Sequence, residues 1–524
     1  MLQFRSPAWF LVAIAGSVSA AIGPSATLPI VNEQVAPDGF SRPAALAGST
    51  FPGPIISGTK GAEFSINVVD NLNDSSMDLG TSVHWHGITQ QHTNYADGPA
   101  FITQCPLVPN ESFLYQFNAL NQTGTYWYHS HFKNQYCDGL RGPLIIYDPD
   151  DPQKYLYDYD NDDTVITLAD WYHYLSTNSP PVPAFNSTLI NGKGRYPGGP
   201  DVPLAIVSVQ QGKRYRFRLV SISCDPGFRF SIDGHQMTVI EADGTSLQPL
   251  VVDSLEIFAG QRYSVVVTAN QPVANYWIRA LPEPTSGLYN FSDFNNVAVL
   301  HYEGAENGDP SVDPSVNVPQ SKLPLVETNL HPLVPTPVPG KPVPGGADIN
   351  INLDVAINNA HTAFLVNNAS FEAPTVPVLL QILSGAKNAS DLVPAGSIYE
   401  LAPNKSVELT IPGGAIGGPH PVHLHGHSFS VVRSAGNSSY NFDNPVIRDV
   451  VSIGNTGDNV TIRFFTDNPG PWFFHCHIDW HLNAGFAVVF AEDVPDVASQ
   501  DPTTDAWKNL CPTFNAYYNE TRHT

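Results

Sequence analysis

Charged residues, and basic ones above all, are scarce in this chain of 524 residues. They make up 14% of it, and 24 Lys and Arg face 48 Asp and Glu, for a formal net charge of −24. Such an acidic balance argues against a nucleic acid or an anionic membrane surface as partner. With 42% hydrophobic residues the chain is nevertheless globular rather than disordered. Its length predicts roughly three domains.

Long apolar runs are also missing. The one candidate, Ala8 to Ala15, is too short to span a bilayer. Arg5 precedes it and Val18-Ser19-Ala20 follow it, which is the pattern of a secretory signal over residues 1–20. We therefore expect a secreted, extracellular protein that is not inserted in a membrane. Asn-x-Ser/Thr sites agree with export as a glycoprotein. They lie at Asn73, Asn110, Asn121, Asn186, Asn290, Asn368, Asn388, Asn404, Asn437, Asn459 and Asn519.

Cysteine is nearly absent, with five in the whole chain: Cys105, Cys137, Cys224, Cys476 and Cys511. In an oxidising compartment four of them pair and one stays free. Spacing cannot choose among the three possible pairings of the four. Because metal ligation needs a free thiolate, we expect Cys476, which stands among histidines, to be the unpaired cysteine.

Gly and Pro, by contrast, are abundant. Their counts of 40 and 47 favour many short strands and turns over long helices. An acidic, turn-rich stretch at 148–163 and a Pro-rich connector within 303–346 predict the linkers between domains. Period-two patterns predict strands of β-sandwiches at 64–68, 112–117, 214–220, 263–267, 406–411 and 459–465.

Histidine is concentrated in four clusters. In a strand, residues i and i+2 point to the same face, so each His-x-His presents two imidazoles side by side. A thiolate with imidazoles is the ligand set that suits copper. A single His-x-His is usually structural, but four clusters among 18 histidines, one centred on a cysteine, indicate a metal centre. The clusters are His84-Trp85-His86, His129-Ser130-His131, His420 to His427, and His475-Cys476-His477 with His481.

These motifs resemble those of the multicopper oxidases, and most closely those of the fungal laccases. Ala96 to Ala100, Asn191 to Gly194 and Asp233 to His235 match as well, so the resemblance runs through essentially the whole mature chain. It implies an all-β fold of three consecutive cupredoxin-like Greek-key β-sandwich domains. The middle one is a spacer and a wall of the substrate pocket. The expected domain ranges are 21–151, 152–322 and 323–524.

The resemblance also implies four copper ions. The type 1 copper takes His420, Cys476 and His481. The type 2 copper takes His84 and His423. The type 3 pair takes His86, His129 and His477 on one ion, and His131, His425 and His475 on the other. Phe486 stands in the axial position, where some relatives have Met, and a phenyl ring cannot donate to a metal. Structural or surface roles remain for His92, His173, His235, His301, His331, His361, His427 and His523.

Three carboxylates are singled out in the same way. Asp225 aligns with the acid that lines the substrate pocket of fungal laccases, where it accepts the proton of a phenol as the electron leaves. Asp97 aligns with an acid beside the trinuclear cluster that assists proton delivery. The competing interpretation of both is a turn or capping Asp. Asp479 is a candidate for orienting a ligand.

The resemblance further implies the disulfides Cys105–Cys511 and Cys137–Cys224. Two positions depart from the commonest fungal laccase pattern. Asn483 stands where many members have Glu, and Lys133 stands where they have a small hydroxyl residue. These positions are thought to interact and to set the tension on the type 1 histidine.

The function implied is that of a secreted, monomeric laccase. Phenols or aromatic amines give single electrons near His481, Cys476 passes them on, and dioxygen is reduced to water at the trinuclear cluster. One alternative is an Fe(II) or Mn(II) oxidase of the same family. Another is a non-catalytic copper store or carrier, against which the eight trinuclear histidines argue. Ascorbate oxidase fits less well, because those relatives usually have Met where this chain has Phe486.

Overall fold

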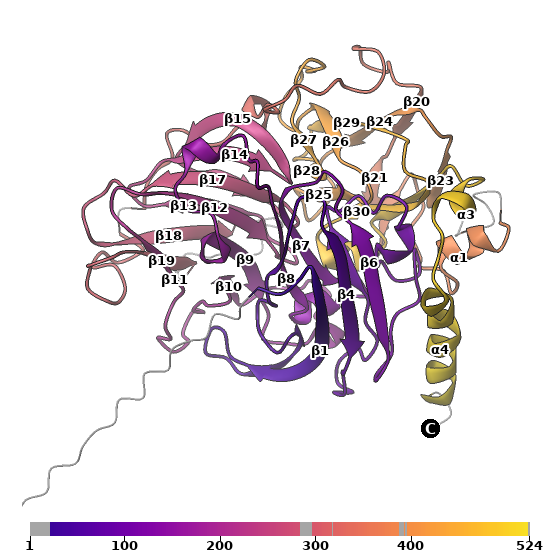
Figure 1. Cartoon of the computed structure of the whole chain (residues 1–524), viewed down its shortest axis with the longest axis horizontal. Coiled ribbons are helices and arrows are strands. Elements are labelled where there is room, and N and C mark those ends of the chain that lie inside the picture. Colours follow the sequence, from indigo (N-terminus) through magenta and orange to yellow (C-terminus); the bar gives the residue numbers. More distant parts are fainter. Residues whose placement is uncertain (1–20, 283–295, 317, 387–391, 393–395, 522–524) are drawn as a thin grey trace, which may run out of the picture.

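The computed structural model describes residues 21–282, 296–316, 318–386, 392 and 396–521 (Figure 1). The expected signal segment 1–20, the glycosylation sites Asn290 and Asn388, and His523 lie outside these residues. Among the described residues, none of the helices is both long and apolar enough to cross a membrane.

The first sandwich pairs two four-stranded sheets, β2-β1-β4-β6 and β3-β8-β7-β5. Its elements are β1 Ser25–Val35, β2 Arg42–Ala47, β3 Ile56–Thr59, β4 Glu63–Asp70, β5 Val83–His86, η1 Asn94–Ala96, β6 Ser112–Asn118, β7 Gly124–Ser130, η2 Gln135–Asp138 and β8 Arg141–Tyr147.

The second sandwich pairs a six-stranded sheet, β10-β9-β12-β17-β14-β15, with a five-stranded one, β11-β19-β18-β13-β16. Its elements are η3 Lys154–Leu156, η4 Asp162–Thr164, β9 Val165–Trp171, η5 Ser176–Asn178, β10 Ser187–Ile190, β11 Ile206–Val209, β12 Arg214–Ser221, β13 Phe228–Ile232, β14 Met237–Ala242, β15 Thr245–Val252, β16 Leu255–Ile257, β17 Arg262–Thr268, β18 Asn275–Pro282 and β19 Val297–Tyr302.

The third sandwich pairs β20-β24-β29-β26-β27 with β23-β31-β30-β25-β28, next to the two-stranded sheet β21-β22. Its elements, with η6 Glu327–Asn329 before them, are β20 Ile349–Asn352, β21 Val355–Ile357, β22 Phe364–Val366, α1 Val378–Leu383, β23 Ile398–Leu401, β24 Ser406–Pro412, β25 Pro421–Leu424, β26 Phe429–Arg433, β27 Ile447–Arg448, β28 Val450–Ser452, β29 Asn459–Phe465, β30 Gly470–Cys476, α2 Asp479–Asn483, β31 Ala487–Glu492, α3 Val497–Gln500 and α4 Asp505–Thr521.

All six strands predicted from period-two patterns are present, as β4, β6, β12, β17, β24 and β29. In β4 the reason is visible: Phe64, Ile66 and Val68 are buried while the residues between them are half-buried. An all-β chain of three successive sandwiches is thereby confirmed. The Pro-rich connector is tied to the second sandwich by bridges from Leu247 to Pro332 and from Ser254 to Pro324.

Covalent cross-links hold the parts together. Cys105–Cys511 joins α4 to the first sandwich, and Cys137–Cys224 joins the first sandwich to the second. Both expected disulfides are therefore present, and Cys476 is free and buried. In Figure 1, β25 and β30 of the third sandwich lie beside β7 of the first.

Candidate metal centre

Strand register brings the histidines into contact. In the first sandwich β5 runs antiparallel to β7, and His84 lies directly across from His129. In the third, β25 runs antiparallel to β30, and His423 lies across from His475. Pairing within each sheet therefore turns two sequence clusters into one face of imidazoles, and the two faces meet where the sandwiches pack.

Eight histidines gather at this interface. Within each of three triplets the candidate ligand atoms lie within 4.8 Å of one another. Across the interface His86 Nδ1 lies 3.2 Å from His477 Nε2, and His131 Nε2 lies 3.4 Å from His475 Nε2. The triplets are His84, His86 and His423; His86, His129 and His477; and His131, His425 and His475.

Backbone carbonyls orient the rings. The Nδ1 atoms of His84 and His423 donate to the carbonyl oxygens of Asp97 and Asp449, each at 2.8 Å. Those of His129 and His475 donate to the carbonyl oxygens of the residues that follow them, each at 2.9 Å. A fixed Nδ1–H leaves Nε2 as the free acceptor, which is how metal-binding imidazoles are held.

The cluster fits metal cations. Burial lowers the pKa of His86, His129, His131, His423, His425 and His477 well below the ordinary value, and neighbouring imidazoles lower it further. The rings are therefore neutral, which is the form that coordinates metals. Among the described residues, Nε2 of His84, His129 and His423 and Nδ1 of His477 are buried without a hydrogen-bond partner. A bound cation would satisfy these buried nitrogens, which otherwise have no partner.

A second group combines two imidazoles with the free thiol. His420 Nδ1 and His481 Nδ1 lie 3.1 Å apart, and Cys476 Sγ is 3.6 Å from the first and 3.8 Å from the second. His420 and Cys476 are buried, whereas His481, on α2, is half-buried. Burial raises the pKa of the Cys476 thiol well above its ordinary value, whereas a coordinated cation holds such a sulfur as thiolate.

Aromatic rings enclose the same group. The Phe486 ring is 5.2 Å from that of His420, and the Phe364 ring is 4.6 Å from that of His481. Phe486 is itself buried. Gly417, in the left-handed region at φ 87°, lies so close to His481 that a Cβ there would be 3.0 Å from the ring. Backbone can approach this ring because the residue is glycine.

Asp97 lies against the cluster, as expected. Its Oδ2 accepts from His425 Nδ1 at 2.8 Å, and its Oδ1 is 3.2 Å from His84 Nδ1. The carboxylate is fully buried and therefore contacts histidines of the first and third sandwiches at once. Its backbone caps the C-terminus of η1, so the capping interpretation holds for the main chain while the buried side chain contacts the histidines.

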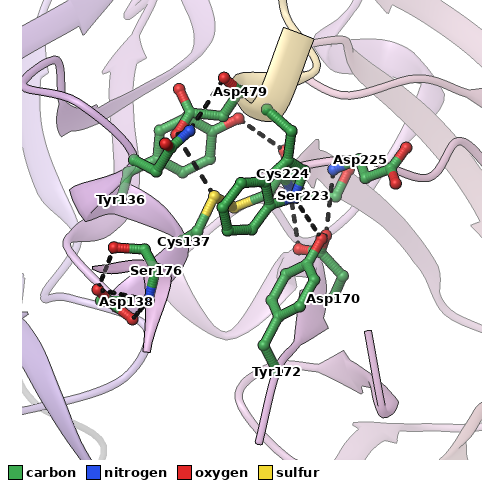
Figure 2. Close-up of a disulfide and its surroundings, with 12 residues drawn as sticks. Tyr136, Cys137, Asp138, Asp170, Tyr172, Ser176, Ser223, Cys224, Asp225 and Asp479 are labelled. Atoms are coloured by element: carbon green, nitrogen blue, oxygen red, sulfur yellow. Dashed lines mark hydrogen bonds between the residues drawn. A yellow bond between two sulfur atoms is a disulfide. The ribbon is translucent and has the colours of Figure 1, made fainter. Parts of the chain in front are cut away.

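Asp225 and Asp479 lie on the two sides of the Cys137–Cys224 disulfide (Figure 2). Asp225 is nearly buried and directly follows Cys224. Asp479 accepts from Asn134 Nδ2 at 3.1 Å and lies 3.4 Å from Cys137 Sγ, and its N–H donates to the Cys224 carbonyl at 2.9 Å. These contacts join α2 to the other two sandwiches.

A buried carboxylate that the sequence analysis missed also supports the cluster. Asp449 Oδ1 lies 3.1 Å from His86 Nε2, and both of its oxygens accept from Arg262, each at 2.6 Å. Arg262 begins β17 of the second sandwich, which contains no candidate ligand. The available signal was Arg448-Asp449 standing between apolar residues of adjacent strands, where charge is costly unless it is paired.

Other singled-out residues have partners of their own. Lys133 forms an ion pair with Asp78, while Asn483 is exposed at the end of α2. Seven histidines assigned structural or surface roles are described, and six have polar contacts: His92, His173, His235, His301, His331 and His427. His361 is exposed in a turn.

Comparisons with known proteins agree with this geometry. The multicopper oxidase family models match residues 30–151, 162–305 and 371–496. The chain is 57% identical over 522 residues to Laccase-1 of Trametes villosa, covering 98% of this chain and 99% of that protein. It is 57% identical over 515 residues to a laccase of Phlebia radiata, covering 98% of each.

Solved structures give the same result. The laccase of Botrytis aclada superposes with a TM-score of 0.79 at 30% identity, covering 97% of this chain and 94% of that one. Fet3p, a multicopper oxidase that functions in iron import, superposes with a TM-score of 0.81 at 28% identity, covering 94% and 95%. The three sandwiches are thus cupredoxin-like domains.

Proposed function

Because this chain belongs to the multicopper oxidase family, and within it to the fungal laccases, we propose that it oxidises phenols and aromatic amines and reduces dioxygen to water. One observation supports this above the others. Cys476 lies in one metal-binding group, and its two neighbours in the chain, His475 and His477, lie in the other. The backbone thus provides a covalent path between a site for electron entry and a site for dioxygen.

We propose that His420, Cys476 and His481 would hold the type 1 copper; the Phe486 ring beside them, 5.2 Å from that of His420, cannot donate to a metal. His84 and His423 are assigned to the type 2 copper. His86, His129 and His477, and separately His131, His425 and His475, are assigned to the type 3 pair. These last two sets coincide with two of the compact triplets. Four coppers held by these residues would supply the one-electron redox chemistry that single-electron donors and the four-electron reduction of dioxygen require.

The chain's own residues then handle substrate and protons. His481 is the half-buried ligand of its group, so a phenol approaches there. As the electron leaves, the phenol O–H bond breaks and its proton passes to the Asp225 carboxylate, leaving a neutral phenoxyl radical. Asp97 holds His84 and His425 and assists proton delivery at the cluster.

Oxygen uptake driven by a methoxyphenol tests the proposal, together with metal analysis and the optical and spin-resonance spectra of the purified protein. We expect four coppers per chain and uptake of dioxygen with each phenol tested. Bound copper without uptake would instead mean a store or carrier. A strong preference for Fe(II) over the phenol would mean a metal oxidase; the identities of 57% to laccases and 28% to Fet3p favour the phenol.

The same proposal includes export and a monomeric state, with domain boundaries at 151/152 and 322/323. Two disulfides support export, because disulfides persist in oxidising compartments. Sedimentation of the mature protein tests the monomer, and its N-terminal sequence tests cleavage near Ala21.

A further inference from the structure

Asp170, which is not among the assigned copper ligands, accepts hydrogen bonds from four donors, of which those on Tyr172, Cys224 and Asp225 can be followed in Figure 2. It accepts from Arg141 Nη1 at 3.0 Å, from the Cys224 N–H at 2.8 Å, from the Asp225 N–H at 3.1 Å and from the Tyr172 hydroxyl at 2.8 Å. Its side chain is fully buried, and Arg141 supplies the compensating charge. Hydrogen bonds to an ionised carboxylate are among the strongest in proteins.

Two of these donors are the backbone N–H groups of Cys224 and of Asp225, the proposed proton acceptor. With both N–H groups held, the peptide between Cys224 and Asp225 has a fixed orientation. Figure 2 shows the Asp225 backbone nitrogen turned toward Asp170 and its carboxylate turned away. Asp170 therefore fixes the backbone from which the Asp225 side chain extends.

The Tyr172 hydroxyl extends the contact to the type 1 group. It donates to Asp170 and accepts from Trp480 Nε1 at 2.9 Å. Trp480 precedes His481 on α2, and its ring meets that of Tyr172 edge-on at 5.2 Å. The Asp170 carboxylate on the second sandwich thus contacts the backbone of Asp225 directly. Through Tyr172 and Trp480 it is also linked to α2, the helix that carries His481.

We propose that Asp170 is a positioning residue for phenol oxidation, which fixes the distance between the Asp225 carboxylate and the exposed edge of His481. The inference rests on the proposed function, since it takes Asp225 as the proton acceptor. Proton and electron leave one phenol hydroxyl together, so acceptor and ligand edge must stay at a fixed spacing. Tyr172 is the second positioning residue, acting on the His481 side.

Tyr172→Phe tests the arm to Trp480 in the copper-loaded enzyme, because it removes one hydroxyl and keeps the buried ring. We expect a changed type 1 optical and spin-resonance spectrum. We also expect kcat/KM to fall about threefold to fivefold for hexacyanoferrate(II) and for a methoxyphenol alike. Tyr174→Phe is the matched control, since that hydroxyl contacts Ala184, and it should leave the spectrum unchanged. An unchanged spectrum in Tyr172→Phe overturns this arm.

Asp170→Asn tests the arm to Asp225. We expect kcat/KM for the phenol to fall at least about tenfold more than for hexacyanoferrate(II), which has no proton to give. Hydrogen exchange of the Cys224 and Asp225 amides should also accelerate. A retained ratio of the two substrates overturns this arm, whatever the exchange shows. If the variant does not fold, the wild-type enzyme decides: the amides of Cys224 and Asp225 must be protected, and rapid exchange overturns the arm.

Asp225→Asn separates this inference from the function it rests on. If Asp225→Asn slows both substrates equally, Asp225 is not the proton acceptor, and the proposed role of Asp170 in phenol selectivity is overturned with it. The exchange and spectral measurements then still report whether Asp170 and Tyr172 hold the two segments. If Asp225→Asn is selective for phenol and Asp170→Asn is not, the positioning role alone fails.

Discussion

At the scale of single residues, the sulfur of Cys476 is the atom on which the proposed electron path depends. Its side chain is fully buried between His420 and His481. Ser has the same shape as Cys with oxygen in place of sulfur, so this replacement changes the side-chain volume little. We expect Cys476→Ser to lose the blue colour and to reduce phenol turnover to background while the other three coppers and the fold remain. Optical spectra, metal analysis and circular dichroism check this. A variant that stays blue contradicts the assignment of the type 1 site.

Asp225 gives a second residue-scale prediction. A general base typically raises a rate by about 10²–10⁴-fold. Of the two substrates compared, only the phenol loses a proton on oxidation. We expect Asp225→Asn to lower phenol turnover at low pH by at least about tenfold more than hexacyanoferrate(II) turnover. The second substrate, measured in the same samples, is the control. Equal slowing of the two classes removes Asp225 from the role of proton acceptor.

At the scale of elements, β17 of the second sandwich supports the cluster through Arg262 although it holds no ligand. Removing the guanidinium leaves Asp449 buried without its cation. We expect Arg262→Met to cost about 3–5 kcal/mol of stability. We also expect it to weaken copper binding at the trinuclear site by about 10–100-fold, because His86 loses its orientation. Metal analysis and the type 2 spin-resonance signal measure this.

Arg279→Met is the matched control for Arg262. Arg279 is equally buried and pairs with Asp233 at 2.7 and 2.8 Å, on the far sheet of the same sandwich. It should lose stability and keep all four coppers. Equal copper loss in both variants would mean that destabilisation, rather than the Arg262–Asp449 contact, empties the site.

The sequence alone predicts those features whose pattern lies within a few neighbouring residues, and it does not predict contacts between residues far apart in the chain. Period-two strands such as β4 and β29 are local, and all six were predicted. His-x-His pairs are local too, and the register of β5 with β7 needed only antiparallel pairing. The Arg262–Asp449 contact joins residues 187 apart and no motif marks it. Helix α4 was missed as well: it contains Pro512, and Cys511 and Trp507 fasten it to the first sandwich.

At the scale of the whole molecule, the acidic composition extends into the interior. Asp70 and Asp501 are buried, and each has one carboxylate oxygen without a partner among the described residues. Burial raises the pKa of each to about 7, from an ordinary 3.8. Asp501 also accepts from the Tyr95 N–H, which joins the tail of the third sandwich to the first.

The sign of the pH effect follows from these raised pKa values. Between about pH 4 and pH 7 these two carboxyls keep protons in the folded protein that they have lost in the unfolded chain, so their contribution to stability falls as pH rises through that window. Each unit of pKa difference corresponds to about 1.4 kcal/mol per group. The buried histidines, whose pKa values are lowered, act in the opposite sense, so the contribution of the two carboxyls is measured as a difference. Relative to Asp70→Asn/Asp501→Asn, we expect the unfolding temperature of the copper-loaded wild-type protein to fall as pH rises over this range.

Asp201→Asn/Asp505→Asn removes the same two charges from side chains that are 85% and 95% exposed. If the two buried carboxyls contribute as expected, this control keeps the wild-type pH dependence while the buried pair of substitutions removes their contribution. If both double variants change the pH dependence equally, the net charge of the whole chain is responsible instead, through repulsion among surface carboxylates. Thermal unfolding of the three proteins at a series of pH values between about 4 and 7 decides between the two.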